Sequence, residues 1–448
     1  MSTTSDSQSL LQYGANVTHG VSRITEGIMK SGKGSYVEYD DGRKMLDFTC
    51  GIGVTSLGHC HPKVSKAAAD QCMDIVHVQC SIAFHEPYLR LIQKLLPIMP
   101  DPSLDSFFFW NSGSEAVEAT LKLARTVTGR QNFICMQGAY HGRTFGAMAV
   151  TRSKTIYSKG VAPLMPGVFT MPFPFWHQLG LPPSTPESTL VAQSLYQLEL
   201  LLAQQTAPSD TAAIIVEPVL GEGGYVPAPA AFLKGLREVC DKHGILLIAD
   251  EVQCGFARTG TFFAIEESGV RPDIMVIAKG LANGFPLSGV ISRKELTDKL
   301  QPGSFGGTYA GNAVSCAAAC AVVDAMHAED ILLNVRARSA ELLASLHGLK
   351  AAYPGHILDV RGRGLMLAVE FATPAGPGAA HDAVASPQVG KTLAARVAKR
   401  CIEKGMLILT TSVYEVVRFI PPLNISAADL KKGAEIFKEA VEEVVREG

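Results

Sequence analysis

Two stretches of sequence decide the fold: Ile245-Leu-Leu-Ile-Ala-Asp250 and Ile274-Met-Val-Ile-Ala-Lys279. Each is apolar at every position before its last residue, which is typical of a β-strand that helices cover on both faces. The segment between them has the length of one crossover connection, so we expect two parallel strands in one sheet. Their charged ends, Asp250 and Lys279, would then lie at the same edge of that sheet, where ligands bind in open α/β folds.

Further strands of the same kind are expected around these two. From about residue 60 to 330, short apolar stretches alternate with longer segments of helical period, which predicts an α/β fold with a mostly parallel central sheet. The two ends of the chain are expected to form a smaller α/β domain together. The expected division is an N-terminal segment with part of the small domain (1–62), a large domain (63–330) and a C-terminal small domain (331–448). The other expected strands are Ser106–Trp110, Asn132–Met136 and Ala212–Glu217.

The composition excludes several classes of protein. The chain has 448 residues, of which 47% are hydrophobic and 18% charged, so it can bury a large core. Its 40 Lys and Arg residues balance 42 Asp and Glu residues, for a net charge of -2. We therefore expect neither nucleic acid nor an anionic membrane as a partner. The longest apolar run, Ala313–Val323, is too short to span a bilayer.

The cysteines and the N-terminus bear on location. The ten cysteines include no Cys-x-x-Cys pair and are too dilute for a disulfide scaffold, which favours a reducing compartment. The first residues lack the basic and apolar regions of a signal peptide. We therefore expect a cytoplasmic protein, because a mitochondrial one would need an atypical targeting signal.

A compact group of metal-ligand residue types lies in Gly58-His59-Cys60-His61-Pro62. Alternate residues of one loop rarely complete a tetrahedral site, and the sequence offers no second group of ligands. We therefore expect no metal.

An anion site is expected at Asn111-Ser-Gly-Ser-Glu-Ala116, where an expected strand meets a helix. The first turn of a helix has free backbone N–H groups and the positive end of the helix dipole, which together bind anions such as phosphate. The alternative is that Ser112 or Ser114 only caps the helix. No Gly-x-x-x-x-Gly-Lys-Ser/Thr motif is present, which argues against a nucleoside triphosphate site.

The pair Asp250 and Lys279 is suited to one chemistry. A charged group at the end of a buried strand is costly unless it is paired or used. A lysine amine there can form a Schiff base, and a carboxylate is the partner that the ring nitrogen of a pyridoxal cofactor requires. A strand-end lysine that only reaches solvent is the alternative, but the neighbouring anion site favours the cofactor.

Six motifs stand in order along the chain: Asn111-Ser-Gly-Ser-Glu-Ala116, Gly138-Ala-Tyr-His-Gly-Arg-Thr144, Glu217-Pro-Val-Leu-Gly-Glu-Gly-Gly224, Ala249-Asp-Glu-Val-Gln253 with Gly255-Phe-Ala-Arg-Thr-Gly260, Ala278-Lys-Gly280 and Gly306-Gly-Thr-Tyr-Ala-Gly-Asn312. This order resembles the class III pyridoxal-phosphate aminotransferases, and most closely those that act on 4-aminobutyrate. The similarity extends from Leu46 to Arg418. It implies a fold-type I transferase with pyridoxal 5'-phosphate bound in the large domain, and a homodimer whose active sites are shared at the interface.

The resemblance also implies roles at the cofactor. Lys279 would hold the cofactor as a Schiff base and shuttle a proton between it and the substrate carbon, while Asp250 would keep the pyridine nitrogen protonated. The phosphate would be bound by backbone N–H groups of the anion site and, from the neighbouring subunit, by Thr308. Tyr140 would stack on the ring, and Gln253 would lie near its phenolic oxygen. The full set expected at the cofactor is Ser112, Gly113, Ser114, Tyr140, His141, Glu217, Asp250, Val252, Gln253, Lys279 and Thr308.

The expected substrates are an ω-amino acid, above all 4-aminobutyrate, and 2-oxoglutarate, which would give succinate semialdehyde and glutamate. In the resembling enzymes, the arginine at Arg143 holds the distal carboxylate and the one at Arg418 holds the α-carboxylate. The acid at Glu217 is expected to neutralise Arg418 when no α-carboxylate is present. Ile52 stands where ornithine-type enzymes place a tyrosine, which argues for a ligand without an α-amino group at its far end.

The sequence is also compatible with other functions. An ornithine or acetylornithine aminotransferase, or a broad ω-amine transaminase, would differ in its preferred amine and keto acid. A decarboxylase or aminomutase with the same Asp250 and Lys279 would act without a keto-acid acceptor. A pyridoxal-phosphate-binding regulator would need a basic DNA-binding segment, which the first 30 residues do not provide.

Overall fold

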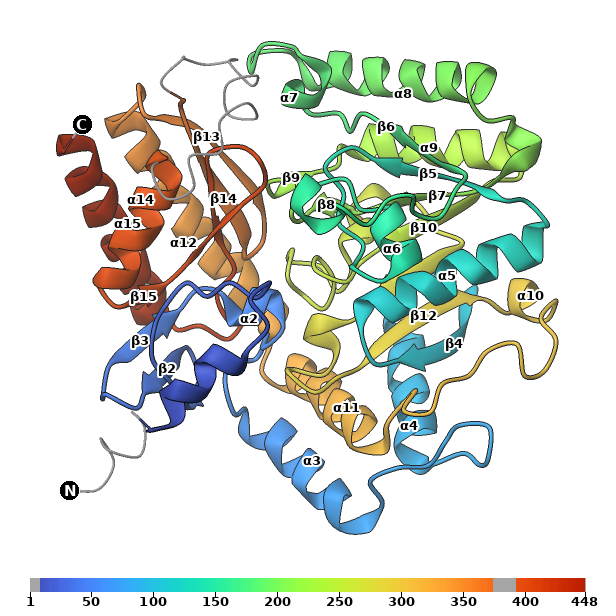
Figure 1. Ribbon diagram of the computed structural model, residues 1–448, viewed down its shortest axis with the longest axis horizontal. Coiled ribbons are helices and arrows are strands. Elements are labelled where there is room, and N and C mark those ends of the chain that lie inside the picture. Colours follow the sequence, from blue (N-terminus) through green and yellow to red (C-terminus); the bar gives the residue numbers. More distant parts are fainter. Residues whose placement is uncertain (1–8, 374–391, 448) are drawn as a thin grey trace.

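The structure, a computed structural model, describes residues 9–373 and 392–447 (Figure 1). At its centre is a seven-stranded sheet in which the pairs made by one strand, β12, are antiparallel and the others are parallel. The predicted α/β fold with a mostly parallel central sheet is confirmed. In sheet order the strands are β4 (Leu104–Trp110), β12 (Ser288–Arg293), β11 (Ile274–Ile277), β10 (Leu246–Asp250), β7 (Thr211–Val216), β5 (Asn132–Met136) and β6 (Val168–Met171).

Burial on both faces explains why these strands are apolar throughout. Along β10, Leu247 and Ala249 lie in the core on one face of the sheet, and Leu246 and Ile248 lie in the core on the other. Alternate side chains are therefore buried on opposite faces of the sheet, so apolar residues are favoured at every position. The helices α8 (Glu187–Gln204) and α9 (Ala230–His243) contribute to the first core, and α5 (Gly113–Thr128) contributes to the second.

Two smaller sheets lie beside the central one. The first is antiparallel and has the order β13 (Ile357–Arg363), β14 (Met366–Phe371), β17 (Val416–Phe419) and β16 (Leu409–Thr411). The second has the order β1 (Met29–Lys33), β2 (Tyr36–Tyr39), β3 (Lys44–Asp47) and β15 (Met406–Leu407). Because β15 pairs in parallel with β3, segments from both ends of the chain share one sheet, as the blue and red ribbons of Figure 1 show.

Helices complete the layers. The longer ones are α3 (Pro62–Asp74), α4 (Glu86–Leu95), α11 (Ala313–Ala328), α12 (Ile331–Ala352), α14 (Leu393–Glu403) and α15 (Ala427–Arg446). Within the described ranges, none is both long and apolar enough to cross a bilayer. The shorter elements are α2 (Cys50–Gly53), α6 (Phe145–Ala149), α7 (Trp176–Leu179), α10 (Lys294–Thr297), β8 (Val219–Leu220) and β9 (Val226–Pro227).

The strand directions bring the charged residues to one edge. Strand β4 runs in the same direction as β11, because β12 is antiparallel to both. The start of α5 therefore lies at the same edge as Glu217 after β7, Asp250 at the end of β10 and Lys279 after β11. This is the edge at which open α/β folds bind ligands.

Candidate active site

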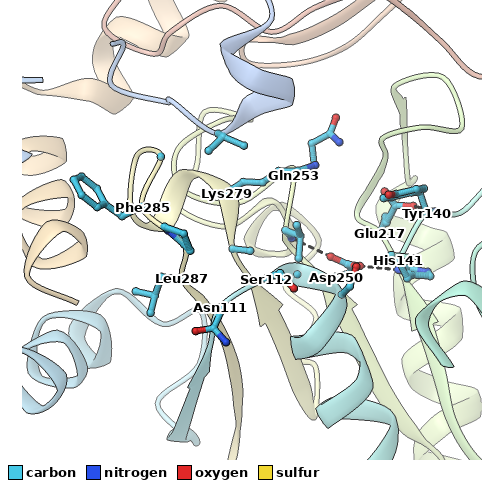
Figure 2. A pocket seen from close by; sticks show the side chains of 18 residues that line it. Asn111, Ser112, Tyr140, His141, Glu217, Asp250, Gln253, Lys279, Phe285 and Leu287 are labelled. Carbon is cyan, nitrogen blue, oxygen red and sulfur yellow. Dashed lines mark hydrogen bonds and ion pairs between the residues drawn. The ribbon is translucent and has the colours of Figure 1, made fainter. Parts of the chain in front are cut away.

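A cavity of about 300 Å³ lies at this edge of the central sheet (Figure 2). It is lined by every residue that the sequence predicts at a cofactor except Thr308. The cavity therefore brings together residues from four separate strand ends. Other lining residues are Val54, Asn111, Gly142, Ala278, Gly284, Phe285, Pro286 and Leu287.

The N-terminus of α5 lies at this cavity. Ser112 Oγ accepts a hydrogen bond from the backbone N–H of Glu115 at 3.3 Å, and Glu115 Oε2 accepts one from Ser112 N–H at 2.8 Å. Gly113 and Ser114 lie in the first turn, so their N–H groups have no acceptor within the helix. A Cβ atom at Gly142, where φ is +134°, would lie 2.4 Å from Ser114 Oγ. Ser112 thus caps the helix, and the two following N–H groups remain for an anion.

Asp250 is fixed by a histidine and by the backbone. His141 Nδ1 lies 2.6 Å from Asp250 Oδ2, and Val252 N–H donates to Asp250 Oδ1 at 3.0 Å (Figure 2). Both His141 and Asp250 are buried, each 3% exposed. Burial lowers the pKa of His141, but the hydrogen bond and the charge of Asp250 outweigh it and raise that pKa above its ordinary value. The carboxylate is therefore held in one orientation next to the His141 imidazole, whose charged form is favoured.

Lys279 follows β11 with a backbone φ of 43°. This left-handed conformation is uncommon for a residue other than glycine and occurs at sites where the surrounding structure imposes it. Burial lowers the pKa of Lys279; the charge of Glu222 opposes this shift, and the charge of Arg418 adds to it. A lower pKa leaves more of the amine neutral, which makes it a better nucleophile.

The partner of Arg418 differs from the sequence prediction. The expected ion pair between Glu217 and Arg418 is wrong, because Arg418 pairs with Glu222 of the same motif. Glu217 instead accepts the backbone N–H groups of Tyr140 and Gly221, each at 2.9 Å. The Glu222–Arg418 pair is buried, with 8% and 3% of the two residues exposed. Glu222 is therefore the acid that pairs with Arg418.

The two acids also differ in charge. Burial raises the pKa of Glu217 to about 7, with the charge of His141 opposing the shift and that of Asp250 adding to it. Burial acts in the same direction on Glu222, but Arg418 outweighs it and holds the pKa of Glu222 below its ordinary value. Of the two acids, Glu222 is therefore the one that is fully ionised near neutral pH.

Arg143 lies at the exposed side of the site. Its Nε donates to the hydroxyl of Tyr140 at 3.2 Å, and its guanidinium carbon lies 4.6 Å from the ring centre of Tyr157. The charges of Arg143 and Arg418 add to the burial that lowers the pKa of Lys154, which places this lysine in the same electrostatic environment. Tyr157 and Lys154 were not expected from the sequence, because no motif marks the loop that contains them.

Four predicted residues are not among those that line the cavity: Ile52, Arg143, Thr308 and Arg418. Thr308 is exposed, and its neighbour Tyr309 contacts the ring of His77, with 5.6 Å between the ring centres. Ile52 is 40% exposed and lies in α2 with φ of 66°. Thr308 therefore does not reach the cavity of its own chain.

The cavity fits pyridoxal phosphate by the chemistry of its donors. Free N–H groups for a phosphate, the Asp250 carboxylate for a protonated ring nitrogen and the Lys279 amine for an aldehyde line one space. The buried Gln253 Oε1 has no hydrogen-bond partner among the described residues, as expected of an amide that meets a ligand.

The histidines of the motif Gly58-His59-Cys60-His61-Pro62, at which we expect no metal, each contact a carboxylate. His59 Nε2 lies 2.8 Å from Asp47 Oδ2, and His61 Nε2 lies 3.2 Å from Glu329 Oε2. Across residues 9–373 and 392–447, no group of three or more His, Cys, Asp or Glu side chains could hold a metal ion.

Comparison with known proteins gives three kinds of match. Residues 18–441 match the family model described as aminotransferase class-III. The chain is 39% identical to a 5-aminovalerate aminotransferase of Pseudomonas putida, over 96% of this chain and 97% of that protein. It is 38% identical to a 4-aminobutyrate aminotransferase of Escherichia coli, over 90% of each. It is also similar to the structure of an amine transaminase from an uncultivated Pseudomonas species in its PLP-bound form, with a TM-score of 0.83, 30% identity and coverage of 95% of this chain and 96% of that chain.

Proposed function

The chain belongs to the class-III aminotransferases and depends on pyridoxal phosphate, and from this premise we infer that it transfers the amino group of 4-aminobutyrate to 2-oxoglutarate. The products are succinate semialdehyde and glutamate. The names of its relatives support an ω-amino acid as the donor. The choice of donor and acceptor within that class is our proposal.

One observation carries this proposal: Arg418 is buried against its own counter-ion, Glu222, and the charges of both residues act on the pKa of Lys279. An ω-amino acid has no carboxylate on its reacting carbon, so an arginine that binds the α-carboxylate of glutamate would be left unpaired in the other half-reaction. An unpaired buried charge is costly. Glu222 removes this cost when the donor is an ω-amino acid, and Arg418 remains free to bind glutamate through two parallel hydrogen bonds.

The roles of the remaining residues follow from the geometry. When bound, the pyridoxal ring supplies an electron sink for the carbon that loses its proton. Lys279 Nζ would hold the cofactor covalently and, once displaced by the donor's amine, move a proton from the substrate carbon to the cofactor. Asp250, held by His141, would keep the proton on the ring nitrogen. Arg143 would bind the distal carboxylate, since its guanidinium is held beside Tyr140 at the open side of the site.

5-Aminovalerate is the second candidate donor, supported by the name of the Pseudomonas putida relative. It is one methylene longer than 4-aminobutyrate, and one methylene changes binding by only about 1–3 kcal/mol. Arg143 is on the exposed side of the site and lies next to a loop, so it can follow a longer chain. We propose activity with both donors and a preference for 4-aminobutyrate.

We further propose that the enzyme is a homodimer with shared active sites. Large apolar side chains are exposed in the single chain: Tyr309, next to Thr308, is 66% exposed, and Ile82 and Phe84 are 80% and 78% exposed. The segment that contains Ile82 and Phe84 leads to His85, whose Nε2 lies 2.8 Å from the backbone oxygen of Gly311. Exposed apolar surface of this kind marks a protein interface. A second copy of the chain that covers it would bring its Thr308 toward the phosphate site, which Thr308 of the same chain does not line.

The domain division and the cellular location also remain proposals. The sheet that joins β3 to β15 supports a small domain built from residues 1–62 and 331–448 around the large domain 63–330. All ten cysteines are free thiols, which supports a reducing, cytoplasmic location.

The test is an assay of amino donors with 2-oxoglutarate as the acceptor and glutamate as the measured product. We expect 4-aminobutyrate to give the highest kcat/KM, followed by 5-aminovalerate, with ornithine, acetylornithine and simple amines lower. A preference for ornithine or for an amine without a carboxylate would overturn the proposed substrate. Omission of the keto acid serves as the control, because product formed without an acceptor would indicate a decarboxylase or aminomutase.

A further inference from the structure

Glu222 lies in the hairpin formed by β8 and β9, in the loop 221–225 that joins the two strands. This hairpin contacts the antiparallel sheet that contains β17. Gly221 N–H donates to Glu217 on one side of the hairpin. On the other side, Arg418 pairs with the Glu222 side chain. The hairpin is therefore held between the end of β7 and the β13–β14–β17 sheet.

A second arginine of that sheet contacts the same hairpin. Arg361 of β13 donates its Nε–H to the backbone oxygen of Gly224 at 2.9 Å. Arg361 lies opposite Ala368 of β14, and Ala368 lies opposite Arg418 of β17. Directly opposed residues of antiparallel strands point to the same face. The two arginines therefore project from one row of the sheet and contact the hairpin two residues apart.

The two arginines differ in how firmly they are anchored. Arg361 Nη1 lies 2.5 Å from Glu370 Oε2 and 3.1 Å from Asp359 Oδ2, so two carboxylates fix its guanidinium. Glu370 is itself bound on its other oxygen by His177 Nε2, at 2.5 Å. Arg418 has one salt bridge within the described part of the chain, with Glu222. The guanidinium of Arg361 is therefore fixed by two carboxylates, whereas Arg418 needs to break only its salt bridge with Glu222 to bind another anion.

The packing around Gly224, whose backbone oxygen accepts the hydrogen bond from Arg361, is close. Gly224 has φ of +116°, and a Cβ atom there would lie 3.1 Å from Arg361 Nη2. The guanidinium carbon of Arg361 also lies 5.1 Å from the ring centre of Phe175. Glycine at this position allows the close approach that the hydrogen bond needs.

We propose that Arg361 is a positioning residue that holds the Glu222 hairpin in place independently of Arg418, and thereby sets the balance between the two half-reactions. This inference rests on the proposed function, in which Arg418 leaves Glu222 to bind the α-carboxylate of glutamate. While Arg418 is bound to substrate, the Arg361 contact to Gly224 keeps Glu222 in reach. Without that contact, Glu222 neutralises Arg418 less well, so the ω-amino acid half-reaction suffers and the glutamate half-reaction does not.

The test uses Arg361→Lys in the cofactor-loaded enzyme. Lysine keeps a positive charge beside Glu370 and Asp359 but has no donor at the position of Nε. In single-turnover experiments without keto acid, we expect the ratio of the 4-aminobutyrate rate constant to the glutamate rate constant to fall about 10-fold. Equilibrium binding of glutarate, which has two carboxylates and no amine, should tighten about 5-fold, because Arg418 is less occupied by Glu222. A merely structural role would not tighten binding.

Arg237→Lys is the matched control. Arg237 also contacts two carboxylates, those of Asp241 and Asp273, and one backbone oxygen, that of Arg271. It lies on α9 and has no contact with the hairpin among its described partners. We expect it to leave both the rate ratio and glutarate binding unchanged.

Two further variants separate the possible failures. If Arg361→Lys does not accumulate as folded protein, Glu370→Gln removes one of the two carboxylates that anchor Arg361 and should change the ratio in the same direction, by about 3-fold. An unchanged ratio in both variants, with a changed ratio in Glu222→Gln, overturns the role of Arg361 alone. If the ratio is unchanged in Glu222→Gln as well, the proposal that Glu222 neutralises Arg418 is wrong, and so is the role of Arg361 that rests on it.

Discussion

Replacement of Glu222 by glutamine tests the substrate assignment most sharply. The variant keeps the size of the side chain and removes the charge that faces Arg418. Arg418 is only 3% exposed, so water cannot replace the lost counter-ion. The ring of Tyr225, whose centre lies 5.9 Å from the guanidinium carbon, offers partial compensation.

The magnitude follows from the burial of the pair. Removal of one partner of a buried ion pair costs about 3–5 kcal/mol, because the other charge is left uncompensated. With the aromatic ring and the remaining amide as weaker partners, we expect about 2–3 kcal/mol to appear in the 4-aminobutyrate half-reaction. This corresponds to a fall of roughly 30- to 150-fold in its rate constant. The glutamate half-reaction should change by less than about 3-fold, since the substrate itself supplies a carboxylate to Arg418.

The assay is single-turnover absorbance of the cofactor with each donor alone, and Glu217→Gln is the control. Glu217 undergoes the same chemical change in the same motif, but it contacts the backbone of Tyr140 and Gly221 and not Arg418. We expect Glu217→Gln to slow both half-reactions by a similar factor. Equal losses in Glu222→Gln, or a selective loss in Glu217→Gln, would refute the reasoning.

Three further predictions concern the binding of the cofactor and the pH dependence of stability. Lys279→Ala should retain no cofactor after borohydride reduction, as measured by the mass of the chain; a persistent covalent adduct would contradict the role of the amine. Gly142→Ala should lower cofactor affinity at least 10-fold in a titration, because the new Cβ displaces Ser114, whereas Gly348→Ala, which meets no atom within 4 Å, should not. Burial raises the pKa of Glu251 to about 7, so this carboxyl binds its proton more tightly in the folded than in the unfolded chain and costs stability as pH rises from about 4.5 to 7. Between pH 5 and pH 8 the wild type should therefore lose about 2.5 kcal/mol relative to Glu251→Gln, measured by denaturant unfolding, and a pH-independent difference would refute this.

Much of the fold was predictable because the central strands are buried on both faces. Strand β5 has the expected bounds, β10 begins one residue later than expected, and β7 begins and ends one residue earlier than expected. Strand β12 was not expected. Its sequence, Ser288-Gly-Val-Ile-Ser-Arg293, is short and partly polar, and only its pairing between β11 and β4 in the folded chain stabilises it.

The site was predictable where residues end a strand and unpredictable where they lie in a turn. Asp250 and Lys279 are placed by the strands that precede them. Glu217 and Glu222 belong to one motif, and the sequence does not reveal which of them faces Arg418. The turn at Gly221–Tyr225 decides this, since Gly224 has φ of +116° and Tyr225 has φ of 55°. The contact of Arg361 with Gly224 depends on strand register and was equally hidden.

The most direct test of the central claim is the absorbance spectrum of the cofactor-loaded protein before and after the addition of single donors, with no keto acid present. We predict that 4-aminobutyrate and glutamate each convert the spectrum to that of the aminated cofactor, that 5-aminovalerate does so more slowly, and that ornithine and a simple amine do so least. Conversion mainly by ornithine or by the simple amine would contradict the ω-amino acid assignment, and no conversion by any donor would contradict aminotransfer itself.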